Sequence, residues 1–133
     1  EQARAFRRRH GQLGAVVIDY LQLVDNGREN RVLDLEQTTR GCKMLAQEID
    51  CVVFLLSQPD KASAQGGELG LHSGKGAGSI ASDCDVMLIP TRDRKDPMRA
   101  GICVPGFRHG PAFVLEVGTL RFNGARMVFE ETP

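Results

Sequence analysis

Two short apolar segments on either side of one amphipathic segment constrain the fold of this chain most strongly. Residues 15–18 (A-V-V-I) and 52–56 (V-V-F-L-L) are continuous apolar runs, which is typical of strands buried on both faces in a parallel sheet. From 29 to 49 the apolar residues recur at three- and four-residue steps and predict a helix with one apolar face. These apolar positions are Val32, Leu35, Cys42, Leu45, Ala46 and Ile49. Strand, helix and strand form a βαβ unit, whose crossover is expected to be right-handed.

The remaining segments predict an N-terminal helix and a C-terminal antiparallel meander, so the fold class is α/β. Residues 2–10 are typical of a helix that ends near Gly11. A third apolar strand over 85–89 is expected after a short helical turn capped by Ser79. Later strands and their turn residues are expected at 101–105, 112–118 and 120–129, with Gly110-Pro111 and Asn123-Gly124 between them.

Size and composition exclude several classes of protein. By length, residues 1–133 form a single domain that is large enough to bury a core. The contents of 41% apolar and 26% charged residues exclude a disordered chain. No apolar run approaches the roughly 20 residues of a membrane span, and the charged residues 1–10 are not a signal peptide. Because there is no initiator methionine, we expect a piece of a longer chain.

Cysteine usage and charge indicate a reducing compartment and only local binding of anions. The four cysteines show no C-x-x-C pair and no histidine at metal-ligand spacing, which favours free thiols in a cytoplasmic protein over a disulfide framework. Lys plus Arg equals Asp plus Glu, at 17 each, so net charge does not attract a polyanion. Cations gather over 1–12 and 91–110, where they either contact phosphates or form a solvated surface.

Asp19 and Gln58 follow the two apolar runs, at the carboxyl edge of the predicted sheet where ligands bind in open α/β proteins. A carboxylate there can hold Mg²⁺ through water, or Asp19 can simply cap the following turn. The Gln58 amide can hydrogen-bond a terminal phosphate or its attacking water, or it can simply bond the loop backbone. Their position on neighbouring strand ends favours a shared site.

Residues 60–78 are rich in glycine and predict a long loop. The run from Gly74 to Ser79 is not a phosphate-binding P-loop, because the pattern G-x-x-x-x-G-K-[ST] occurs nowhere in the chain. Backbone N–H groups beside Lys75 suit contact with nucleic-acid phosphates, and a plain linker is the alternative. Arg108 lies in a predicted turn, either as an arginine finger for a neighbouring subunit or as an ordinary surface arginine.

Several ordered groups of residues resemble motifs of the DnaB-like replicative DNA helicases. Leu13 to Val24, L-G-A-V-V-I-D-Y-L-Q-L-V, is similar to the Walker B segment of that family, and the Arg-rich helix before it fits as well. Further matches are Leu56-Ser57-Gln58, Gly78-Ser79-Ile80 with Asp83 and Asp85, Arg92-Asp93, and Arg108-x-Gly110-Pro111. The similarity covers nearly the whole chain.

The resemblance implies a RecA-like three-layer ATPase core, truncated at its N-terminal side. It further implies a hexameric ring that uses ATP and Mg²⁺ and moves along single-stranded DNA. By position, Asp19 would orient the metal, Gln58 would sense the terminal phosphate and Arg108 would be the finger, which makes these three the catalytic residues. Lys75, Gly76 and Gly78 would lie on the loop that faces DNA.

The sequence also departs from the family pattern. The P-loop and the catalytic Glu are expected upstream of Glu1, as is the N-terminal domain that organises the ring and binds primase. Gly106 stands where the family usually has a Lys, and Lys75-Gly76 stands where Arg-Glu is usual. We therefore expect the isolated chain to hydrolyse no ATP, because the loop that cradles its phosphates is missing.

Three functions are consistent with these observations. The leading one is part of a replicative-helicase motor domain, with single-stranded DNA and primase or a helicase loader as partners and no membrane partner. The second is a non-catalytic module that binds single strands or helicase subunits. The third, another RecA-like ATPase, is disfavoured by the sequence Asp-Tyr-Leu-Gln after the first strand. Exposed edges of the strands at 16–18 and 52–56 also predict self-association, and hence a dimer.

Overall fold

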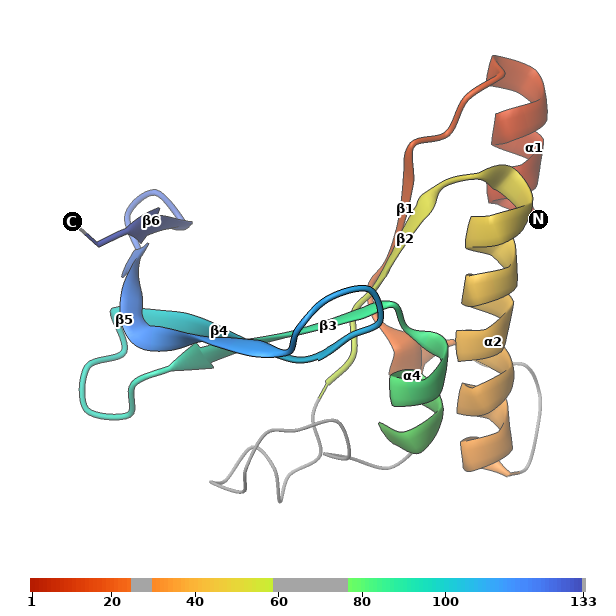
Figure 1. Ribbon diagram of the computed structural model, residues 1–133. Helices are drawn as coiled ribbons and strands as arrows, with labels where there is room; N and C mark the ends of the chain where they lie inside the picture. Colours follow the sequence, from red (N-terminus) through yellow and green to blue (C-terminus); the bar gives the residue numbers. More distant parts are fainter. Residues whose placement is uncertain (25–29, 59–76, 133) are drawn as a thin grey trace. The chain divides into compact units, whose positions relative to one another are not determined.

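The structure is a computed structural model that describes residues 1–24, 30–58 and 77–132. The described residues form two compact units, of which the first extends to Cys84 and the second begins at Asp85. Each unit has its own sheet, one parallel and one antiparallel. The predicted fold class, parallel strands followed by an antiparallel meander, is therefore confirmed (Figure 1).

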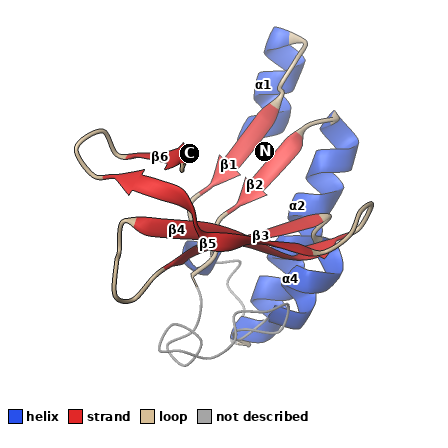
Figure 2. Ribbon diagram, turned by 60° about the vertical axis from the view of Figure 1, so that its left-hand side comes forward, coloured by secondary structure: helices blue, strands red, loops and turns tan. Residues whose placement is uncertain are grey.

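The first unit is built around a two-stranded parallel sheet. Its elements are α1 (Gln2–His10), β1 (Ala15–Ile18), the short 3₁₀ helix η1 (Leu21–Leu23), α2 (Arg31–Ile49), β2 (Val52–Leu55) and α4 (Ala77–Asp83). β1 pairs with β2 from Ala15 opposite Val52 to Ile18 opposite Leu55. Helix α2 connects the two strands, as Figure 2 shows. The βαβ unit expected from the two apolar runs is confirmed.

Helix α2 begins and ends with clear capping geometry. The Asn30 side chain accepts a hydrogen bond from the Val32 N–H at 3.0 Å, which satisfies one free donor of the first turn. At the other end, Asp50 adopts the left-handed conformation (φ 50°) that closes a helix. The helix therefore begins two residues later than expected and ends at the expected residue.

The buried face of α2 is more polar than its apolar periodicity predicted. Leu35 and Ile49 are buried as expected, whereas Val32 is 43% exposed. Asp34, Thr38 and Thr39 are buried in its place. The buried face of the helix is therefore the expected one from Leu35 to Ile49, and Asp34, Thr38 and Thr39 share it with the apolar residues.

The prediction that both strands of the parallel sheet are buried on both faces was wrong. Exposure alternates along β1 and β2, and the register partners Val17 and Phe54 are 65% and 51% exposed. Helix α2 packs against β2, so the side chains on one face of the sheet are partly covered. The other face presents an apolar surface.

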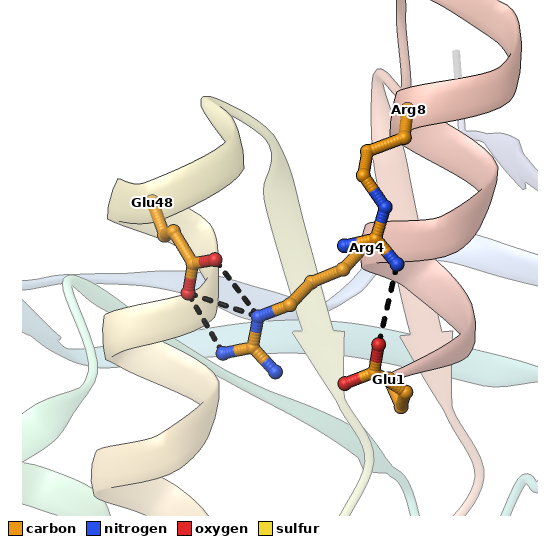
Figure 3. Close-up of polar contacts among 4 residues, drawn as sticks. All are labelled: Glu1, Arg4, Arg8 and Glu48. Carbon is orange, nitrogen blue, oxygen red and sulfur yellow. Dashed lines mark hydrogen bonds and ion pairs between the residues drawn. The ribbon is translucent and has the colours of Figure 1, made fainter.

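Helix α1 ends at His10 and is capped by Gly11, whose φ of 77° is the left-handed conformation that glycine adopts at low cost. This confirms the expected end of the helix. No residue of α1 is buried. A polar contact links it to α2: the Arg4 Nη2 lies 2.7 Å from the Glu48 Oε2, and the Arg4 Nε lies 2.8 Å from the Glu48 Oε1 (Figure 3).

The second unit is a four-stranded antiparallel meander in chain order. Its strands are β3 (Val86–Arg92), β4 (Arg99–Phe107), β5 (Phe113–Asn123) and β6 (Val128–Glu131). The expected boundary between strands 112–118 and 120–129 was wrong, because β5 runs on from Phe113 to Asn123 and the chain turns only after Asn123. Asn123 does supply the turn, since its Oδ1 accepts the Arg126 N–H at 3.3 Å.

Candidate functional site

Asp19 and Gln58 lie beyond neighbouring strand ends of the parallel sheet. Asp19 follows the last residue of β1, and Gln58 lies three residues after the end of β2. The Leu56 N–H donates to the Ile18 carbonyl at 3.0 Å, and the Leu21 N–H donates to the Leu56 carbonyl at 2.8 Å. These bonds extend the pairing past the strands. The prediction that Asp19 and Gln58 follow neighbouring parallel strands, at the carboxyl edge of the sheet, is confirmed.

A third side chain, which the sequence analysis did not single out, joins the two strand ends. The Gln22 Nε2 donates to the Ser57 Oγ and to the Gln58 carbonyl, each at 3.0 Å. The Gln58 N–H in turn donates to the Gln22 Oε1 at 3.2 Å. One amide therefore satisfies both backbone polar groups of Gln58. The sequence carried a signal for it only as one letter of the Walker B-like segment.

The chemistry of this edge suits a magnesium ion bound together with phosphate. Asp19 is exposed, and no side chain or backbone group of the described residues bonds its carboxylate. Protein sites often hold Mg²⁺ through one or two carboxylates, with water and substrate phosphate completing the shell. A single carboxylate fits that pattern, and residues 1–24, 30–58 and 77–132 hold no cluster of three or more metal-binding side chains.

Arg108 lies in the second unit, in the turn after β4. Its Nε lies 3.1 Å from the Asp85 Oδ1, and its backbone N–H donates to the Asp85 carbonyl at 2.8 Å. Both side chains are nearly half exposed, at 45% and 44%. The turn is therefore tied to the start of β3, and the guanidinium is held at the surface of its own unit.

The residues proposed to bind nucleic acid are only partly described. Lys75 and Gly76 lie outside the described residues. Gly78 lies in α4, which begins at Ala77 rather than at a cap formed by Ser79. The Gly78 carbonyl accepts a hydrogen bond from the Ser82 Oγ at 2.8 Å, and a methyl group at Gly78 would meet no atom within 4 Å.

A polar contact between α2 and α4 also escaped the sequence analysis. The Thr39 Oγ1 donates to the Asp83 Oδ2 at 2.7 Å, and Thr39 is only 4% exposed. Beside it lies an open groove of about 550 Å³. Its lining residues are Leu33, Glu36, Gln37, Arg40, Gly78, Ser82 and Asp83. Periodicity gives no signal for this contact, because a threonine on the buried face of a helix interrupts the apolar pattern.

Helices of the described segments are too short or too polar to cross a membrane.

Comparison with known proteins gives one consistent result. Residues 1–131 match the DnaB-like helicase C terminal domain. The replicative DNA helicase DnaB of Leifsonia xyli subsp. xyli is 33% identical over 126 residues, which is 87% of this chain and 27% of the relative. The chain therefore spans about a quarter of the length of that relative.

Solved structures agree with the sequence match. One solved ATPase domain superposes with a TM-score of 0.84 at 25% identity, over 99% of this chain and 49% of that chain. A DnaB-like replicative helicase, solved with attention to its interactions with primase, superposes with a TM-score of 0.79 at 25% identity, over 92% of this chain and 31% of that chain. The RecA-like ATPase fold of these helicases accounts for the parallel sheet and the meander. The chain belongs to the DnaB-like helicase C-terminal domain family.

Proposed function

We propose that this chain forms part of the motor domain of an ATP-dependent replicative DNA helicase that binds ATP between subunits and translocates on single-stranded DNA. The observation that carries the proposal is the placement of Asp19 and Gln58 beyond adjacent parallel strand ends. Membership of the family supports it.

Each proposed residue has a distinct role. Asp19 orients Mg²⁺ on the phosphates, and its exposed carboxylate supports this role. Gln58 senses the terminal phosphate through its side-chain amide, which can both donate and accept a hydrogen bond. Arg108 is offered to the nucleotide of a neighbouring subunit, where a guanidinium stabilises charge that develops on the phosphates. Lys75, Gly76 and Gly78 contact the phosphates of single-stranded DNA.

The proposed assembly is a homo-oligomer, with a hexamer as the functional form and primase or a helicase loader as a partner. It acts in the cytoplasm. ATP and Mg²⁺ are its cofactors, and we propose that the chain by itself hydrolyses no ATP, because its 133 residues contain no G-x-x-x-x-G-K-[ST] loop.

The proposal is tested with a chimeric helicase. In this chimera, residues 1–131 of the present chain replace the matching segment of the Leifsonia xyli relative. We expect the chimera to hydrolyse ATP in the presence of Mg²⁺, and Asp19→Asn to lower its kcat by about 10²–10³. The isolated chain should show no turnover.

A matched variant makes the result specific. Asp50→Asn removes another exposed carboxylate of the same unit, at a helix end where asparagine is also tolerated, and it should leave kcat unchanged. A chimera that assembles and binds single-stranded DNA without Asp19-dependent turnover would contradict the motor function and favour a non-catalytic module.

A further inference from the structure

Gln22 lies three residues after Asp19 and reaches across to the other strand end. Its amide makes three contacts with Ser57 and Gln58, at 3.0, 3.0 and 3.2 Å. These bonds join residues 35 and 36 positions apart in the chain. The contact with both backbone groups of Gln58 has the pattern of one more rung of the parallel ladder, made by a side chain where the backbone has already turned into η1.

We propose that Gln22 is a positioning residue that holds the Gln58 backbone at a set distance from Asp19. This inference rests on the proposed function, in which Gln58 senses the terminal phosphate and its distance from Asp19 therefore matters. Gln22 touches neither substrate nor metal in this role. It acts only through Gln58.

The chemistry of the contact requires a glutamine. An amide supplies an acceptor to the Gln58 N–H and two donors, which the Ser57 hydroxyl and the Gln58 carbonyl use. Glutamate keeps the acceptor and loses the donors. Methionine has a similar length and supplies neither a comparable acceptor nor a donor. Gln22→Glu therefore removes part of the contact, and Gln22→Met removes all of it.

The position of the Gln58 backbone depends on Gln22, because the neighbouring backbone hydrogen bonds do not fix it. The last backbone bond of the ladder joins Leu21 to Leu56, and Gln58 lies two residues further on and is exposed. No other contact between described residues holds the backbone N–H of Gln58. Loss of the Gln22 amide therefore frees the Gln58 backbone, while Asp19 keeps its place directly after β1.

The first test measures the contact itself in the 133-residue chain. We expect Gln22→Met to raise the hydrogen-exchange rate of the Gln58 amide about tenfold, with the amides of β1 and β2 unchanged. Gln47→Met is the matched control, because Gln47 is exposed on α2, and it should leave the Gln58 rate unchanged. An unchanged Gln58 rate in Gln22→Met overturns the proposal.

The second test measures what the position does, in the chimeric helicase defined above. The readout is the ratio of the Kd for ADP to the Kd for ATP, which reports recognition of the terminal phosphate and is insensitive to a loss of folded protein. We expect Gln22→Met and Gln58→Ala each to lower this ratio about tenfold, and the double variant to lower it no further. Gln22→Glu should lower the ratio by a smaller factor.

The outcomes separate this inference from the proposed function. A chimera that binds no nucleotide, with faster exchange of Gln58 in Gln22→Met, contradicts the proposed function and leaves the positioning contact established. Independent, additive effects of Gln22→Met and Gln58→Ala on the ratio overturn the positioning role. If Gln22→Met does not fold, Gln22→Glu provides both measurements.

Discussion

The Arg108 Nε lies 3.1 Å from the Asp85 Oδ1, so the arginine proposed to act on a neighbouring subunit is paired within its own unit. Both side chains are nearly half exposed, and exposed ion pairs contribute only about 0–1 kcal/mol to stability. The pair therefore orients the guanidinium without preventing its release to another anion.

The first prediction separates orientation from catalysis at Arg108. In the chimeric helicase, Arg108→Ala should lower kcat by about 10³ or more, since arginine fingers contribute on that order. Asp85→Asn should lower kcat much less, because the guanidinium is kept. An equal loss of kcat in the two variants would contradict a finger role and indicate that the pair is needed only for structure.

The second prediction concerns pH and the contact between α1 and α2 (Figure 3). The hydrogen bonds from Arg4 lower the pKa of Glu48 below its ordinary value of 4.5. A carboxyl with a lowered pKa stabilises the folded state fully above its unfolded pKa, and this contribution is lost as the pH falls through the folded pKa. Glu48→Gln should therefore lower the Tm at pH 7 and have no effect on it in strong acid.

A second carboxyl provides the control for this pH dependence. Glu131 is an exposed carboxyl of the second unit, and Glu131→Gln should leave the pH dependence of the Tm as it is in the wild type. Equal Tm differences for Glu48→Gln at pH 7 and at about pH 2 would contradict the argument.

The third prediction concerns the partly buried hydrogen bond between α2 and α4. Thr39→Val keeps the shape of the side chain and removes the hydroxyl that donates to Asp83. Since a partner left without its bond costs about 1–3 kcal/mol, the variant should be less stable by that amount in urea denaturation. Thr39→Ser keeps the hydroxyl and should retain most of the stability that Thr39→Val loses. Equal stability of the Val and wild-type proteins would show that water replaces the bond.

The fourth prediction concerns the exposed apolar face of the parallel sheet. Val17 and Phe54 are register partners there and are more than half exposed, and exposed apolar patches favour association. The isolated chain should self-associate with rising concentration in sedimentation velocity, and Phe54→Thr should weaken this. Met44→Gln changes an apolar residue that is 61% exposed on α2 and should have no such effect. A monomer at all concentrations contradicts the prediction.

Local sequence patterns determined the elements of this protein. The apolar runs before Asp19 and Gln58 predicted β1, β2 and the edge at which the two residues lie. A short apolar run bounded by polar residues favours a strand whether one or both faces of its sheet are covered. Gly11 and Asn123 marked a helix end and a turn, since their backbone and side-chain preferences act within a few residues. The ordered motifs also pointed to the family that the comparisons show.

Only the tertiary structure decided how these elements hold one another. Gln22 meets Gln58 across 36 positions, and Thr39 meets Asp83 across 44. Partners so distant leave no periodic trace, because each bond depends on where two separate backbones bring a donor and an acceptor. The exposed face at Val17 and Phe54 was likewise hidden from the pattern, since an apolar run has the same composition whether one or both faces of its sheet are covered.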